Sequence, residues 1–105
     1  MELSISDIRE LLGGSNSQDE SPYVTGEKYL IRCVTMFYTG RIIRETANEL
    51  VLDDTAWIAS TGRFHDALKT GKLDEVEPFV SPVIIPKSTI VDASVWTHDL
   101  PRSQS

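Results

Sequence analysis

The side chains that most often bind metals or act as nucleophiles are scarce in this chain. It has two histidines, His65 and His98, and one cysteine, Cys33. Zinc sites need several such ligands at short, characteristic spacings, which these three residues do not provide. Cys33 cannot form a disulfide within the chain, and it lies in an apolar run where free cysteine usually packs as a small hydrophobic residue. The sequence therefore predicts no metal site, no reactive thiol and no cofactor.

Asp53 and Asp54 are adjacent carboxylates of the kind that could perform general acid-base chemistry. Neighbouring side chains of a β-strand point to opposite faces, however, so these two cannot share a proton as a catalytic pair must. The pair is more simply the solvated end of a strand. No catalytic motif accompanies it, and we predict that the protein is not an enzyme.

Thr61, Gly62 and Arg63 form a candidate anion-binding site, because they lie at the start of an expected helix. Free N–H groups and the helix dipole favour negative charge at a helix start, and an arginine adds a planar fork of donors. Ordinary helix capping accounts for the same three residues and is the commoner role.

A basic segment in an acidic protein is the second candidate for ligand binding. The 105 residues carry a net charge of −6, which disfavours nucleic-acid binding because that depends on a cationic surface. Residues 28 to 44 nevertheless contain no acid. We therefore keep a nucleic-acid or nucleotide interface as the alternative function, with Tyr38 or Phe37 as the stacking surface. Its cations would be Lys28, Arg32, Arg41 and Arg44, with Arg63 as a fifth.

These side chains must be positioned by β-structure, because residues 28 to 58 show the pattern of three consecutive strands. Runs of apolar and β-branched residues predict strands over 28–38, 41–46 and 49–58. Thr39-Gly40 and Ala47-Asn48 are the expected turns, since glycine and asparagine tolerate the backbone angles that turns require.

The second half of the chain adds a helix and two short strands. We expect a helix over 61–71, an acidic connector over 74–78, a strand over 82–86 and a last strand over 89–96. The prolines at 82 and 86 restrict their strand to a short or edge role. The predicted fold is mainly β: a five-stranded small barrel with a short N-terminal helix and a helix inserted between strands three and four.

Apolar residues occur on both faces of the first strand, which predicts that the second face is covered. A short amphipathic helix over 4–12, joined by the polar linker 13–22, could cover it, and so could a second subunit. Trp57 and Trp96, which close two strands, are either interface or core residues, and core is the commoner role. The candidate interface residues are Leu3, Ile8, Leu11, Leu12, Leu30, Val34, Met36, Trp57 and Trp96.

The chain resembles SH3-like small barrels and, within that group, the Sm-like arrangement. Tyr38–Ile42 match the bend into the second strand, 50–55 the third strand, and 83–91 the last hairpin. The resemblance implies a barrel of five strands. Sm-like proteins usually have a very short link where this chain has the 61–71 helix, and their RNA-binding loop residues have no match here. A looser similarity, through Arg32, Gly40-Arg41 and 52–57, is to small uncharacterised proteins of phages and mobile elements.

The predicted organisation is an N-terminal helix and linker over 1–27, a barrel over 28–98 and a flexible tail over 99–105. The start of the chain lacks the features of a secretory signal, and its apolar runs are far shorter than the roughly 20 residues that span a bilayer. We expect a cytoplasmic protein without membrane association. The function that we predict is a non-enzymatic binding or assembly module, with a homo-oligomer or protein partner, which self-associates through barrel edges and its N-terminal helix.

Overall fold

The computed structural model describes residues 21 to 104. The expected N-terminal helix, with Leu3, Ile8, Leu11 and Leu12, lies outside the described residues. Within them the chain forms antiparallel strands, one α-helix and one 3-10 turn. Their bounds are β1 Lys28–Cys33, β2 Phe37–Glu45, β3 Glu49–Ser60, α2 Phe64–Thr70, β4 Glu75–Pro78, β5 Val83–Pro86, η2 Lys87–Thr89 and β6 Ile90–Val95.

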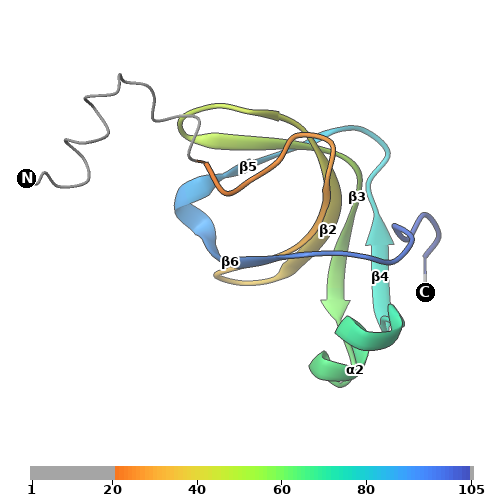
Figure 1. Cartoon of the computed structure of the whole chain (residues 1–105). Coiled ribbons are helices and arrows are strands. Elements are labelled where there is room, and N and C mark those ends of the chain that lie inside the picture. The colour runs from red at the N-terminus through yellow and green to blue at the C-terminus, as the bar shows by residue number, and fades with distance from the viewer. Residues whose placement is uncertain (1–20, 105) are drawn as a thin grey trace, which may run out of the picture.

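The strands form one open antiparallel sheet in the order β4-β3-β2-β1-β6 (Figure 1). The long strand β3 organises it, because its two halves pair with different strands. Residues Glu49 to Leu52 pair with β5, and residues from Ala56 to Ser60 pair with β4. The mainly β expectation and the helix between the third and fourth strands are confirmed. The strand count was wrong, because residues 75–78 of the expected acidic connector form β4.

The turn between the first two strands lies elsewhere than we predicted. The chain reverses at Val34–Met36, where the Cys33 N–H donates to the Met36 carbonyl at 2.8 Å. Gly40, expected in the turn, lies inside β2 opposite Tyr29. A side chain there would place its Cβ 2.8 Å from Leu52 Cδ2 and 2.8 Å from Thr55 Oγ1. The glycine is therefore required by close packing rather than by a turn.

Helix α2 is shorter than the predicted 61–71 segment. It ends at Gly71, whose φ of 79° is the left-handed conformation that glycine adopts at little cost. Its amide donates to the Ala67 carbonyl at 2.8 Å. The apolar pattern of 64–68 predicted the helix correctly, but residues 61–63 lead into it without joining it.

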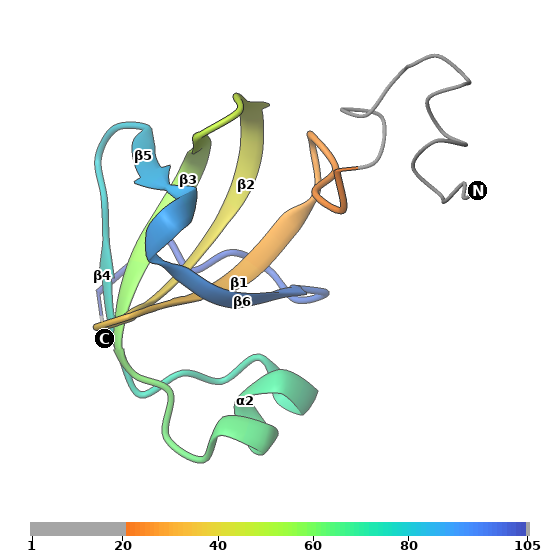
Figure 2. The same cartoon turned by 90° about the vertical axis from the view of Figure 1, so that its left-hand side faces the viewer.

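Two apolar clusters lie on opposite faces of the bent sheet. The first, which we call the strand core, contains Tyr29, Ile31, Cys33, Ile42, Leu50, Leu52 and Ile85. The second, the helix-side core, contains Leu30, Trp96 and Leu100 together with Ala56, Ile58 and Val76, with Phe37, Leu68 and Leu73 packed against them. Figure 2 shows α2 beneath β1 and β6, where Leu68 reaches the second cluster. The second face of β1 is thus covered by α2 and the C-terminal segment.

The segment after β6, which we expected to be a flexible tail, packs against the sheet. Leu100 is buried in the helix-side core, and the Trp96 Nε1–H donates to the Asp99 carbonyl at 3.1 Å. Arg102 forms an ion pair with Asp54 at 2.8 Å, and the Gln104 amide donates to the Glu77 carboxylate at 3.0 Å. These contacts hold residues 99–104 against β3 and β4.

Candidate functional site

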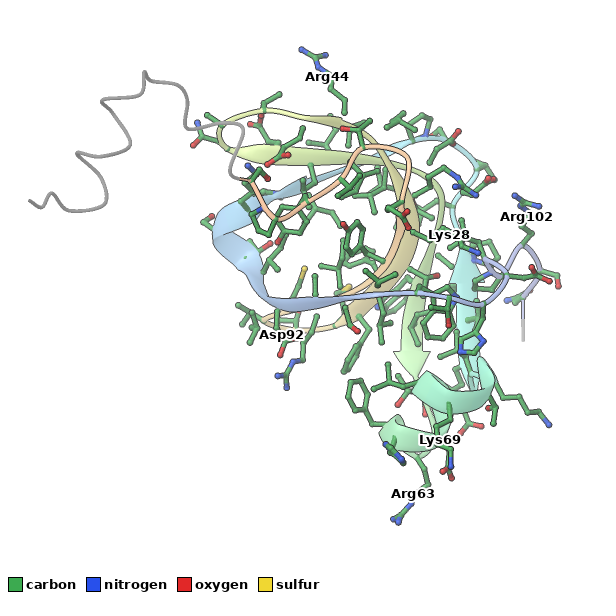
Figure 3. All side chains as sticks on the ribbon, viewed as in Figure 1. Lys28, Arg44, Arg63, Lys69, Asp92 and Arg102 are labelled. Carbon is green, nitrogen blue, oxygen red and sulfur yellow. The ribbon has the colours of Figure 1, made fainter. Side chains whose placement is uncertain are left out.

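The predicted anion site at Thr61, Gly62 and Arg63 is shared with two carboxylates. The three residues line a hollow of about 410 Å³ together with Asp66, Asp74 and the cation Lys72. The Gly62 N–H already donates to Ser60 Oγ at 3.3 Å. Arg63 is exposed and lies at the outer end of the molecule (Figure 3). Because two acids share the hollow and the helix has only seven residues, the geometry does not favour an anion here.

The predicted nucleic-acid residues are divided among separate regions. Arg32 forms a two-pronged ion pair with Asp92, through Nε–Oδ1 at 3.1 Å and Nη2–Oδ2 at 2.5 Å. Hydrogen bonds from Arg32 hold the pKa of Asp92 below its ordinary value. Arg44 projects from the opposite end of the molecule (Figure 3). Tyr38 stacks on Phe79, with ring centroids 6.2 Å apart, on the face of the sheet that carries the strand core.

Lys28 and Arg41 remain together and are joined by a cation that sequence reasoning missed. They are directly opposite each other in the β1–β2 ladder. With Arg102, Asp99 and Leu100 they line a hollow of about 400 Å³, which we call the basic hollow. Figure 3 shows Lys28 and Arg102 on the same side of the molecule. No sequence signal pointed to Arg102, because it lies in a polar segment that lacks any periodic pattern.

Each cation of the basic hollow has a defined partner. Lys28 Nζ donates to the His98 carbonyl at 2.5 Å, and Arg41 Nη1 donates to the Gly26 carbonyl at 2.9 Å. Arg102 Nη2 donates to Asp54 Oδ2 at 2.8 Å. The hydrogen bond from Arg102, helped by the charge of Arg41, lowers the pKa of Asp54. The site is therefore a hollow with three cations, which the Asp99 carboxylate also lines and whose Arg102 is paired with the Asp54 carboxylate.

The candidate interface residues within the described range fall into two groups. Leu30 and Trp96 are buried in the helix-side core and offer no surface to a partner. Val34, Met36 and Trp57 line a hollow of about 330 Å³ beside the β1–β2 turn. Val34 is 74% exposed and Trp57 is 38% exposed. The fold thus places three of the predicted interface residues around one hollow, which Arg32 and Thr35 also line.

The two ends of the sheet are the remaining candidates for contact with a partner. Among the described strands, β6 pairs only with β1, while β4 and β5 pair only with β3. Val91 and Val95 on β6 and Ile84 on β5 are each more than half exposed. Sequence reasoning predicted a contact role for strand edges but did not identify these residues.

The described residues hold no cluster of three His, Cys, Asp or Glu side chains that could bind a metal ion, and none of their helices could cross a membrane. His65 is exposed, His98 packs edge-on against Trp96, and Cys33 is buried. Comparison of the chain with models of protein families, with curated proteins and with solved structures gave no match.

Proposed function

We propose that this protein is a non-enzymatic assembly module that self-associates through the free edge of β6. The observation that carries the proposal is an open sheet whose last strand has a neighbour on one side only among the described residues. An unpaired strand edge presents a row of N–H and C=O groups that another strand can complete. The exposed Val91 and Val95 add apolar surface beside that row.

The hydrogen-bonding direction of β6 supports pairing between two copies. The Trp96 N–H donates to the Lys28 carbonyl, so it points toward β1. Backbone groups alternate in direction along an antiparallel strand, so those of Val95 and Ala93 point outward. Two β6 strands centred on Ala93 would form an antiparallel pair, with Val95 close to Val91 of the second copy. Such a contact uses the same patch twice and closes as a dimer.

The opposite end of the sheet is less suited to strand addition. β4 ends at Pro78, and β5 ends at Pro86 and is preceded by Pro82. Proline has no N–H to donate to a neighbouring strand, and natural proteins use it to protect edges. β6 contains no proline. The geometry therefore favours β6 as the assembly edge.

We also propose that the fold is an SH3-like small barrel. Its support is the meander β1-β2-β3, the short strand β5 ending in a proline, the 3-10 turn η2 and the return of β6 to pair with β1. Residues of all five strands contribute to the strand core or pack against it. In this arrangement β4 and α2 are additions to the barrel. We also predicted that an N-terminal helix takes part in self-association, and its residues lie outside the described range.

Replacement of Val95 by proline tests the assembly edge. The change removes one outward N–H and leaves the ladder to β1 intact, so we expect a folded monomer where the native protein is a dimer. Light scattering over a concentration series from about 1 to 100 µM, with circular dichroism to confirm folding, measures both. Val95→Thr, which keeps the N–H and the branched shape, is the matched control and should remain dimeric. A native protein that is monomeric at every concentration would contradict the proposal.

A further inference from the structure

The basic hollow carries an inference that is independent of self-association. Lys28 and Arg41 are directly opposite each other on adjacent strands, an arrangement in which like charges repel. Both donate to neutral main-chain carbonyls, and no carboxylate of the described residues lies within ion-pair distance of either. Neither side chain therefore has a direct ion-pair partner among the described residues, although Asp53 lies opposite Arg41 on β3 and the charge of Arg41 helps to lower the pKa of Asp54.

Both side chains also have donors to spare. A lysine ammonium has three N–H donors and an arginine guanidinium has five, and each uses one in the contacts described above. The hollow between them has a volume of about 400 Å³ and is lined in part by the apolar Leu100. We propose that the basic hollow binds one phosphoryl group of a small anion such as a phosphate monoester.

Arg102 supplies the third cation, and its present partner acts as a competitor. The Arg102–Asp54 ion pair is solvent-exposed, with 67% of the arginine side chain and 39% of the aspartate side chain accessible. Exposed pairs of this kind contribute little to stability. A phosphoryl group offers three acceptor oxygens and matches the fork of an arginine better than one carboxylate oxygen does. An anion that enters the hollow would therefore take Arg102 from Asp54.

The size and distribution of the positive charge select the ligand class. A nucleic-acid strand is bound along a track of cations that follows several phosphates. Here Arg32 is held by Asp92, while Arg44 and Arg63 lie at opposite ends of the molecule (Figure 3). Three cations around one hollow, which Asp99 also lines, suit a single phosphoryl group.

Titration of the full chain with inorganic phosphate tests the site, and sodium chloride at matched ionic strength is the control. We expect saturable shifts in the amide resonances of residues 28, 41, 100 and 102 with phosphate and not with chloride. Lys28→Gln, Arg41→Gln and Arg102→Gln should each weaken binding about tenfold, the usual effect of losing one charged hydrogen bond. Arg44→Gln and Arg63→Gln are matched charge-removal controls and should bind as the native protein does.

Asp54→Asn provides a test in the opposite direction. Asn tolerates the positive φ of 48° at this position, so the backbone should be retained while Arg102 is released. We expect phosphate to bind about threefold or more tightly in this variant. A matched phosphate monoester, such as adenosine 5′-monophosphate, should bind at least as well as inorganic phosphate.

A short single-stranded DNA with a 5′-phosphate tests whether the protein binds a terminal phosphoryl group or a nucleic-acid strand. Binding that requires only the three cations of the basic hollow supports a terminal phosphoryl group. Binding that is also lost in Arg44→Gln or Arg63→Gln indicates an extended track and overturns the proposal. Phosphate shifts that chloride reproduces, or that survive all three hollow substitutions, overturn it as well. None of these variants alters β6, so self-association can fail without affecting this result.

Discussion

The strand core and the helix-side core differ in how their residues are supplied. The strand core is assembled from side chains of the strands themselves, most of them in the consecutive strands β1, β2 and β3, with Ile85 added from β5. The helix-side core joins Leu30 of β1 to Trp96 and Leu100 near the end of the chain. The first is made by strands alone, whereas the second also needs residues of α2 and two residues after β6, Trp96 and Leu100. The sheet is therefore stabilised on one face by its own strands and on the other by a cover from elsewhere in the chain.

The largest expected loss of stability comes from removing Trp96 from the helix-side core. Trp96 is 2% exposed and also donates from Nε1 to the Asp99 carbonyl. Trp96→Ala should reduce the free energy of unfolding by about 3–5 kcal/mol, the usual cost of a large buried aromatic residue. Urea denaturation measures it. Trp57→Ala, the control at the more exposed tryptophan, should cost less than about 1 kcal/mol. Equal losses in the two variants would mean that Trp96 does not belong to a stabilising core.

The second prediction concerns the stability of the fold when Gly71, which ends α2 against His98, is replaced. Gly71 has a φ of 79°, and a Cβ there would lie 2.6 Å from His98 Cγ. Gly71→Ala should destabilise the fold by about 2–4 kcal/mol, because backbone strain and steric overlap add. Thermal unfolding followed by circular dichroism measures this loss. Gly26 also has a positive φ but has open space around it, so Gly26→Ala isolates the strain alone and should be the milder change.

Gly40 provides the corresponding test in the strand core. A Cβ at this position would overlap the buried side chains of Leu52 and Thr55, but its φ is not in the left-handed region. Gly40→Ala should therefore cost about 1–3 kcal/mol through overpacking alone. If Leu52→Ala in the same chain restores part of the loss, the overlap is confirmed as the cause. Additive losses in the double variant would show that it is not.

The smallest expected effect is a pH dependence at the rim of the strand core. Burial alone would raise the pKa of Glu45, but hydrogen bonds from Lys87 and Ser21 outweigh it and bring the pKa below its ordinary value of 4.5. Because the pKa of Glu45 is lower in the folded state, its ionised carboxylate stabilises the fold fully at pH values above the pKa of the unfolded chain. This stabilisation is lost as the pH falls through the pKa of the folded state. Glu45→Gln should thus cost less than about 1 kcal/mol at pH 7. Urea denaturation of both proteins at pH 7 and pH 3 should show this difference disappear in acid, and a constant difference would exclude ionisation as its origin.

Sequence patterns predicted the parts of the fold that depend on neighbouring residues. Alternation predicted three strands over 28–58 and the second turn at Ala47-Asn48, and the structure has β1, β2 and β3 in this range, although the expected first strand ran through the turn into β2. The position of Gly40 was misread, because a glycine required by packing against Leu52 looks the same in sequence as one required by a turn. Residues 75–78 were predicted to be a connector because they are mostly acidic, but they form the four-residue strand β4.

The candidate sites were less predictable than the strands. Lys28 and Arg41 were identified as cations, but their direct pairing depends on a strand register that the misplaced turn had shifted. Arg102 could not be found, since its position beside Asp54 depends on where the chain returns after β6. The same return explains why Leu30 is covered from within the chain rather than by a partner.

By itself, the sequence determined a mainly β protein with a helix inserted after its third strand, since side-chain alternation and helical periodicity are local properties of the chain. Tertiary structure alone decided the strand register, the burial of Trp96 and Leu100 in a second core, and the gathering of three cations around one hollow. These features arise where segments far apart in sequence meet. Each follows from the path of the whole backbone, which no short window of residues specifies.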